Sequence, residues 1–223
     1  MKVIEGKRKD LEKKASNIIE LEIKKLLKEK KSIVFGIVGG KSIVGILKQI
    51  KNSDIEWNKV HIFMVDERRV SLKNKESNFK IVNEFLLNYL IKNKKIKKKN
   101  IHPYHYSTPI KKYSNELKKH GGKFDIIILS SGEDGHIAGL FPNSTIKNKS
   151  NYFITFNNSP KYPKKRISAS KKLLEKSNVA ILLFFGNNKK EAYKKFNEKR
   201  ISILECPAKL VRKIKRTYVL RAS

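Results

Sequence analysis

The stretch FDIIILSSGEDGH, residues 124–136, joins an apolar run to a loop that holds two glycines, two acids and a histidine. A short apolar run bounded by turn residues is typical of a buried β-strand. The stretch therefore predicts a strand at 124–129 whose carboxyl end presents polar and titratable side chains.

Three more apolar runs have the same form. Residues 33–38, 60–65 and 179–185 are each followed by glycine or by an acid. Segments with apolar residues at helical spacing lie between these runs, which predicts helices there. The predicted helices are 9–30, 42–50, 77–91, 111–119, 189–198 and 207–213, and weaker strands are predicted at 152–156 and 217–220.

The order of these elements predicts the fold class. Strands that alternate with helices and consist of continuous apolar runs indicate a parallel sheet covered on both faces. No linker rich in glycine, serine or proline divides the 223 residues. We therefore predict a single α/β domain over residues 1–223, with a mostly parallel, Rossmann-like sheet and helices on both faces.

The composition excludes several classes of protein. Hydrophobic residues make up 39% of the chain, which argues against disorder, and the single cysteine, Cys206, excludes a disulfide scaffold. The longest apolar run, 179–185, is far shorter than the roughly 18 residues of a membrane span. The N-terminus lacks the apolar stretch of a signal peptide. We therefore expect a globular protein of the cytoplasm.

The formal net charge of +32 has two explanations. Lysine and arginine number 52, of which eight are arginine, against 20 aspartates and glutamates. The excess can reflect a surface that binds nucleic acid, or an AT-rich genome that favours lysine codons. Arginine is the preferred residue for phosphate and guanine recognition, so its scarcity favours the genomic explanation. The lysine-rich run at 92–100 is expected to be a solvated helix end and loop.

The turn GGKS, residues 39–42, follows the strand predicted at 33–38. Ligands of open α/β sheets bind at the carboxyl ends of strands. Glycines let the backbone approach a ligand, and a helix that begins near Ser42 offers free N–H groups to a phosphate. An ordinary strand–helix turn is the alternative, and the spacing differs from that of the nucleotide-binding P-loop.

A second strand end carries Asp66, Glu67 and Arg68 directly after the run at 60–65. Acids placed there must be hydrogen-bonded or paired, because burying an unpaired charge is costly. Arg68 can pair with them or bind an anionic substrate. A structural ion pair is the alternative.

The third strand end is the loop at 132–136, whose flanking glycines can present the imidazole of His136 in a cleft. Imidazole is the usual general base near neutral pH. Asp134 or Glu133 can hold its other ring nitrogen. A lone histidine can also be purely structural.

The other four histidines carry no recognisable motif. His61 lies inside a predicted strand and is expected to be a core or sheet residue, whereas His102 and His105 flank a proline in a predicted loop. Because no HExxH or comparable ligand spacing occurs, the sequence predicts no metal site.

A fourth segment, SPKYPKKRIS at 159–168, combines prolines with several cations, among them Lys161 and Arg166. Prolines stiffen a loop, so these side chains can close over an anion. A plain basic surface loop is the alternative.

These segments, in this order, resemble the 6-phosphogluconolactonase family, which shares its fold with glucosamine-6-phosphate isomerases and deaminases. The similar blocks are VDERRV at 65–70 with SNF at 77–79, GEDGHIAGLFP at 132–142, SPK to RIS at 159–168, and CPA at 206–208. Each block alone is modestly specific, but all of them in order are highly specific. The resemblance extends from about residue 33 to residue 222.

The resemblance implies hydrolysis of 6-phosphoglucono-1,5-lactone to 6-phosphogluconate, the second step of the oxidative pentose phosphate pathway. It implies a small sugar phosphate as substrate, with no cofactor and no metal. His136 would take a proton from the attacking water, Asp134 would orient His136, and Asp66 would lie in the active site. The residues expected to bind the substrate and its phosphate are Gly39, Gly40, Lys41, Ser42, Arg68, Lys161 and Arg166. Lys41 stands where the family usually has a hydroxyl residue.

Two alternatives stay open. The isomerases and deaminases share the fold and the histidine, but their sequence continues toward a glutamate, whereas residues 139–142 here read GLFP without an acid. A basic nucleic-acid-binding protein that has lost catalysis would account for the charge. The oligomeric state is not predicted.

Overall fold

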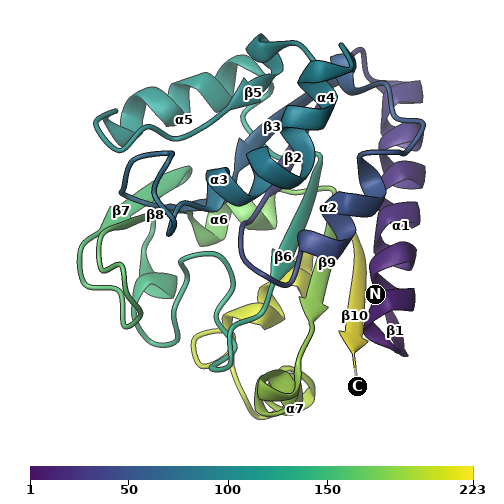
Figure 1. The fold of residues 1–223 in the computed structure, drawn as a ribbon. Helices are drawn as coiled ribbons and strands as arrows, with labels where there is room; N and C mark the ends of the chain where they lie inside the picture. Colours follow the sequence, from purple (N-terminus) through teal and green to yellow (C-terminus); the bar gives the residue numbers. More distant parts are fainter. Residues whose placement is uncertain (223) are drawn as a thin grey trace.

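The structure is a computed structural model that describes residues 1–222. Its centre is a seven-stranded sheet in the order β1-β10-β9-β6-β2-β3-β5 (Figure 1). Each strand pairs in parallel with its neighbours, which confirms the predicted parallel sheet. The strands are β1 (Lys2–Gly6), β2 (Ile33–Ile37), β3 (Val60–Met64), β5 (Ile101–His102), β6 (Ile126–Ser130), β9 (Val179–Phe184) and β10 (Arg216–Ala222).

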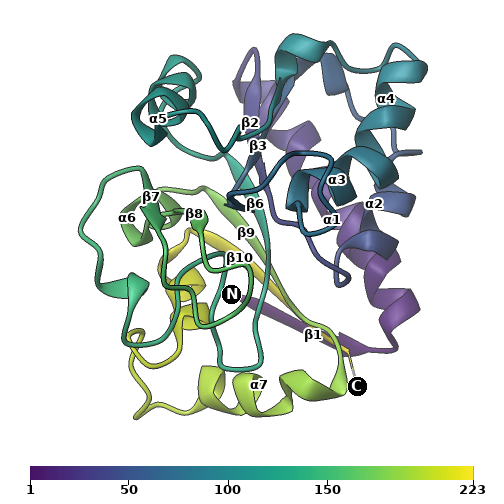
Figure 2. The same ribbon diagram turned by 60° about the vertical axis from the view of Figure 1, so that its left-hand side comes forward.

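Helices cover both faces of this sheet, as predicted. Figure 2 shows α1, α2, α3 and α4 on one side and α5 and α6 on the other, with α7 near one end. Their bounds are α1 (Arg8–Glu29), α2 (Val44–Ile50), α3 (Asn78–Val82), α4 (Asn88–Lys92), α5 (Ile110–Lys119), α6 (Lys171–Glu175) and α7 (Lys190–Asn197). Every residue of β2 and of β9 is buried, because both faces of these strands are covered.

Two predicted helices differ in detail. The helix predicted at 77–91 is interrupted by a π-helical turn at Asn83–Leu87, which separates α3 from α4. The helix predicted at 207–213 is a 3₁₀ segment, Pro207–Lys213. Apolar spacing alone does not distinguish these helix types, because all three bury one side of a short turn.

A second, antiparallel sheet was not predicted. It consists of β4 (Asp66–Arg68), β8 (Arg166–Ala169) and β7 (Phe153–Phe156), in the order β4-β8-β7. Only β7 corresponds to a predicted strand, because β4 and β8 are short and contain charged residues. Their pairing depends on contacts between segments about 100 residues apart, which no local pattern reports.

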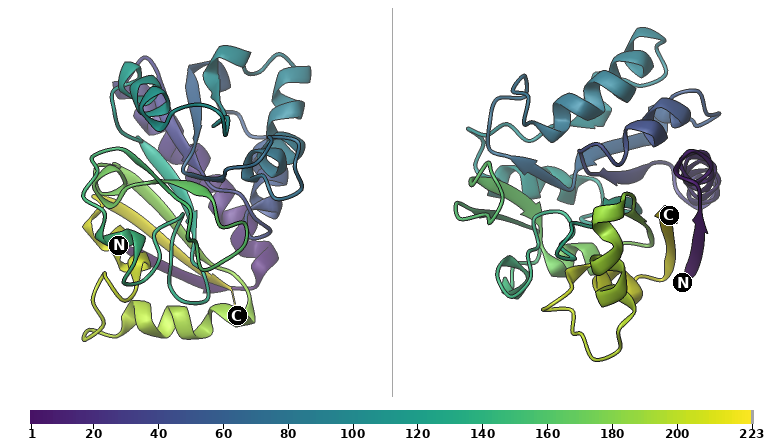
Figure 3. Two further views of the ribbon diagram at one scale, coloured as in Figure 1. Left: turned by 90° about the vertical axis from the view of Figure 1, so that its left-hand side faces the viewer. Right: turned by 60° about the horizontal axis from the view of Figure 1, so that its bottom comes forward.

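The first strand, β1, was also missed by the sequence analysis. It lies at one edge of the central sheet and pairs only with β10, as Figure 3 (right) shows. An edge strand of five residues, mostly exposed, gives no continuous apolar run.

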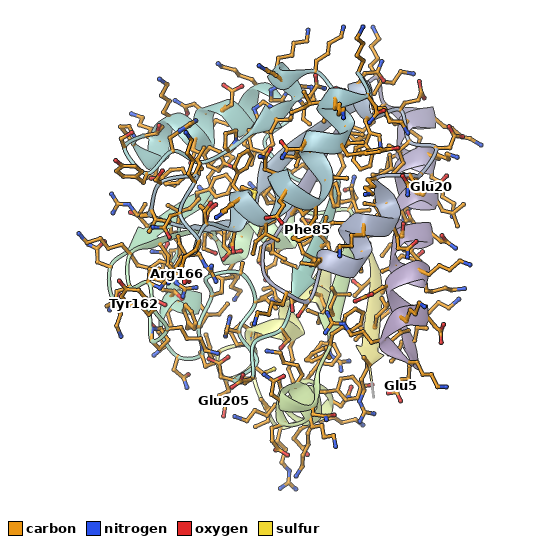
Figure 4. The ribbon with its side chains drawn as sticks, in the orientation of Figure 1. Glu5, Glu20, Phe85, Tyr162, Arg166 and Glu205 are labelled. Carbon is orange, nitrogen blue, oxygen red and sulfur yellow. The ribbon has the colours of Figure 1, made fainter. Side chains whose placement is uncertain are left out.

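Charged side chains project from the molecule in all directions. Figure 4 shows nitrogen-tipped side chains around the whole outline, which agrees with the even spread of lysine along the sequence. Within residues 1–222, each helix is too short or too polar to traverse a bilayer.

His61 in β3 and His102 in β5 lie at the opposite edge of the sheet from β1. His102 was expected in a loop but is a buried strand residue. Burial and the neighbouring imidazole of His120 lower the pKa of both His61 and His102 to about 4. Glu116 opposes this shift at both residues. Both side chains are therefore neutral at pH 7.

This arrangement predicts a pH-dependent stability. The unfolded chain binds protons at these histidines below about pH 6.5, whereas the folded chain does so only near pH 4, so stability is lost as the pH falls through this window. Between pH 7 and pH 5, we expect the free energy of unfolding to fall by about 1–2 kcal/mol more in the wild type than in His61→Asn. Urea unfolding at the two pH values measures the difference, and equal losses would contradict it.

Candidate active site

A cleft of about 260 Å³ opens at the carboxyl edge of the central sheet. The segments that follow β2, β3 and β6 meet there, because parallel strands end at the same edge of a sheet. The segment that precedes β8 closes another side. The lining residues are Val38, Gly39, Gly40, Ser42, Asp66, Arg68, Asn78, Ser130, Ser131, Gly132, His136, Ala138, Lys161, Tyr162, Arg166 and Lys189.

The predicted site residues converge on this cleft with two exceptions. Asp134 does not line it, but lies behind His136 and contacts its ring. Lys41 is exposed, and its backbone carbonyl accepts a hydrogen bond from Arg8 Nη2 at 3.0 Å. The Lys41 side chain is thus absent from the cleft lining, although the neighbouring Ser42 is part of it.

The turn at 39–42 differs from the expected helix start. Helix α2 begins at Val44, and Ile43 rather than Ser42 occupies the N-cap position. Gly40 has a φ of +94°, a backbone conformation that favours glycine. Ser42 therefore lies in the turn before the helix rather than at its N-cap, and it lines the cleft.

His136 and Asp134 form a short polar contact at the edge of the cleft. The distance from His136 Nδ1 to Asp134 Oδ1 is 2.5 Å, and the same oxygen accepts from the His136 backbone N–H at 3.2 Å. Partial burial raises the pKa of Asp134, but the hydrogen bond and charge of His136 outweigh it and lower the pKa below its usual range. An ionised Asp134 favours the proton on Nδ1, so Nε2 is the nitrogen that can accept a proton.

The backbone of the 132–136 loop is shaped around this pair. A Cβ at Gly132 would lie 2.0 Å from both Nδ1 and Cε1 of His136, so only glycine fits. Gly135 has a φ of +87°, and its carbonyl accepts a hydrogen bond from the Ala208 N–H at 2.9 Å. A Cβ at Gly135 would approach Cys206 Sγ to 2.8 Å. The CPA block at 206–208 thus packs against the 132–136 loop that holds His136.

Glu67 is a structural residue and does not line the cleft. Its buried carboxylate accepts hydrogen bonds from the backbone N–H groups of Arg68, Asn78 and Phe79, each at 2.7 Å. The Ser77 hydroxyl donates a fourth, at 3.0 Å. Burial raises the pKa of Glu67 to about 7, although these backbone donors oppose the shift. The carboxylate caps the start of α3 and ties it to β4.

Asp66 precedes Glu67 and lines the cleft. Its Oδ2 accepts a hydrogen bond from Asn78 Nδ2 at 3.1 Å. Burial raises the pKa of Asp66, and the charges of Arg68 and Arg166 oppose the shift. A Cβ at Gly39 would lie 2.3 Å from Asn78 Oδ1, so this glycine makes room for the amide that holds Asp66.

Two arginines lie side by side on adjacent strands of the second sheet. Arg68 in β4 and Arg166 in β8 are paired in register, and both line the cleft. Like charges placed opposite one another repel, which favours an anion between them. Arg166 Nε donates to the Pro163 carbonyl at 2.9 Å, and its Nη2 donates to the Lys161 and Tyr162 carbonyls, each at 3.1 Å. Arg166 therefore also shapes the 159–165 loop, and Figure 4 shows it beside Tyr162.

Five polar residues of the cleft lining were not among the predicted site residues: Asn78, Ser130, Ser131, Tyr162 and Lys189. Lys189 lies beyond the carboxyl end of β9, and burial lowers its pKa. The position of Lys189 after the carboxyl end of β9 is the signal that could have identified it. Asn78 belongs to the SNF block at 77–79, but its contact with Asp66 depends on the fold. With Arg68, Lys161 and Arg166, Lys189 makes four cations against one acid in the lining.

The cleft residues include few metal ligands. Among residues 1–222, the cluster of three potential ligands found in the structure is His61, His102 and His120, which lies outside the cleft.

Comparisons with known proteins agree with one another. The model of a family described as glucosamine-6-phosphate isomerases/6-phosphogluconolactonase matches residues 6–220. A protein of Borreliella burgdorferi named 6-phosphogluconolactonase is 38% identical over 192 residues, 83% of this chain and 81% of that protein. A 6-phosphogluconolactonase of Thermotoga maritima is 33% identical over 178 residues, 77% of each chain. A crystal structure of 6-phosphogluconolactonase from Thermotoga maritima has a TM-score of 0.87 at 26% identity, covering 100% of this chain and 99% of that one.

The packing of His136 against Gly132 predicts the effect of a single methyl group. In Gly132→Ala, the added Cβ forces the imidazole away from Asp134, and we expect the free energy of unfolding to fall by about 1–3 kcal/mol. Urea unfolding and a crystal structure of the variant measure both effects. Gly6→Ala is the control, because its Cβ would come no closer than 3.9 Å to Leu11. An unmoved ring in Gly132→Ala would contradict the prediction.

Proposed function

The chain belongs to the family of glucosamine-6-phosphate isomerases and 6-phosphogluconolactonases, and on this premise we propose that it hydrolyses 6-phosphoglucono-1,5-lactone to 6-phosphogluconate. The observation that carries the proposal is the short contact between His136 and Asp134 in a cleft lined by four cations. An activated water and an anchor for a phosphate are what this reaction needs. We expect the reaction to take place in the cytoplasm.

In the proposed mechanism, His136 Nε2 removes a proton from a water molecule as the water oxygen attacks the lactone carbonyl carbon, C1. Asp134 keeps the Nδ1 proton in place and stabilises the imidazolium that forms. The tetrahedral intermediate then collapses, and the bond between C1 and the ring oxygen breaks. His136 returns the proton to the ring oxygen, which becomes a hydroxyl. C1 becomes a carboxylic acid, which releases its remaining proton to solvent to give the carboxylate.

The cations of the cleft are proposed to bind the phosphate of the substrate. Arg68, Lys161 and Lys189 offer charge, and the turn at 39–42 offers backbone N–H groups and the Ser42 hydroxyl. Arg166 holds the carbonyls of the 159–165 loop and thereby positions Lys161. Binding energy from the remote phosphate places C1 beside His136, as expected for a substrate whose reacting group is small and neutral.

Asp66 is proposed to orient a hydroxyl group of the sugar. Its carboxylate is held by Asn78 and lies in the cleft near the positive charges of Arg68 and Arg166. A buried carboxylate held this way is a rigid hydrogen-bond acceptor.

Removal of the proposed base tests the mechanism. In His136→Ala, we expect kcat for lactone hydrolysis to fall by about 10²–10⁴-fold, because general base catalysis contributes factors of this size.

In Lys189→Ala, we expect mainly a rise in KM, because the phosphate loses one contact. Lys98→Ala, an exposed lysine in the basic run, is the matched control and should match the wild type.

The assay must subtract spontaneous hydrolysis of the lactone, and it should include glucosamine 6-phosphate as a second substrate. Fast hydrolysis by both the wild type and His136→Ala would support the lactonase activity but show that His136 is not the general base. Failure of the wild type to exceed background would reject the proposed function. Turnover of glucosamine 6-phosphate would favour the isomerase branch.

The net charge of +32 predicts salt-dependent capture of an anionic substrate. Between about 10 mM and 150 mM salt, the Debye length shortens from about 30 Å to about 8 Å. We expect kcat/KM to fall by up to about tenfold over this range while kcat stays constant, if encounter limits the reaction. A flat kcat/KM would show that the charge does not steer the substrate.

A further inference from the structure

Three histidines from separate elements converge at the edge of the central sheet away from β1. His61 comes from β3, His102 from the edge strand β5, and His120 directly follows α5; β3, β5 and α5 lie together in Figure 1. One ring nitrogen of each lies within 4.8 Å of the other two. Because the separations along the chain are 41 and 18 residues, no sequence motif marks the cluster.

Two of the nitrogens have nearly the spacing of ligands on one metal ion. His61 Nδ1 and His102 Nε2 are hydrogen-bonded to each other at 3.0 Å, and a metal ion bound by both would replace the shared proton. Two nitrogens bound to tetrahedral Zn²⁺ at 2.0–2.1 Å would be separated by about 3.3 Å. A shift of a few tenths of an ångström therefore brings these two side chains into coordination geometry.

Glu116 faces the cluster from α5. Its Oε1 lies 3.6 Å from His102 Nδ1 and 3.5 Å from His120 Nε2, while its Oε2 binds Lys119 Nζ at 2.9 Å. The Glu116 carboxylate faces Nδ1 of His102, so Nε2 of the same ring can bind a metal. A carboxylate on the far nitrogen orients a histidine ligand and increases its basicity.

The three rings differ in their freedom to move. His102 is buried and stacks on Phe63, with ring centroids 4.0 Å apart and planes 9° apart. His120 lies tilted over His61 with centroids 3.8 Å apart, so it must swing outward to share a metal. It can do so because it follows the last turn of α5 and 22% of its side chain is exposed.

We propose that His61, His102 and His120 bind a divalent transition metal ion, best matched by Zn²⁺, with Glu116 as the orienting carboxylate. Imidazole nitrogens suit Zn²⁺, and three protein ligands leave a fourth position for water. The site joins α5 to the edge strand β5, which is only two residues long. His61 lies near the start of β3, whereas the cleft residue Asp66 follows the end of β3. The proposed metal site is therefore separate from the cleft, and its role is to stabilise this edge of the sheet. The inference does not rest on the proposed reaction.

Titration of the untagged, chelator-treated full chain with Zn²⁺ tests the proposal. We expect one Zn²⁺ per chain by competition with a chromophoric chelator, a higher melting temperature with the metal, and a tetrahedral absorption spectrum with Co²⁺. Glu116→Gln should weaken binding by about 10–100-fold, as loss of an orienting carboxylate does. His120→Ala should weaken it at least as much, because a direct ligand is lost.

Two histidines outside the cluster provide matched controls. His105→Ala removes an exposed histidine, and His136→Ala removes the imidazole of the cleft; both should bind Zn²⁺ like the wild type. Should His120→Ala fail to fold by circular dichroism, Glu116→Gln decides the question. The proposal is overturned if the wild type does not bind Zn²⁺, if His136→Ala abolishes binding, or if Glu116→Gln and His120→Ala bind like the wild type.

Discussion

The buried carboxylate of Glu67 is the interaction on which the candidate site depends. It collects three backbone N–H groups and one hydroxyl, and so fixes β4 against the start of α3. Because Asp66 and Arg68 flank Glu67 in the chain, fixing one residue places the other two. Desolvation of this carboxylate is costly, and four donors are what make its burial tolerable. Glu67 thus positions two cleft residues, Asp66 and Arg68, although it does not itself line the cleft.

Close approach is the second constraint. Gly132 lets the His136 ring lie against the backbone, and Gly39 does the same for Asn78. In both places the missing Cβ makes room for a side chain that holds a titratable group. The positions of the polar groups in the cleft therefore depend on these two glycines as much as on the charged residues that line the cleft.

The sequence alone predicted the parallel sheet, its two helical layers and half of the residues that line the cleft, because buried strands give continuous apolar runs and parallel strands share one carboxyl edge. It could not predict the second sheet, since β4 and β8 are short, charged and paired only in the fold. For the same reason, the sequence did not predict that Arg166 shapes the 159–165 loop. His120 went unnoticed because its partners come from other elements. The role of Glu67, by contrast, follows from the rule that a buried acid needs donors.

The pairing of β1 with β10 has a consequence for biosynthesis. β1 is synthesised long before β10, which is its only partner in the sheet within the described residues 1–222. Its hydrogen-bonding groups therefore remain without their strand partner until β10 has been synthesised. The nascent chain can assemble the inner strands early, but the sheet is complete only once β10 has left the ribosome. A chain that stops before β10 leaves both β1 and the flank of β9 open to pairing with other chains.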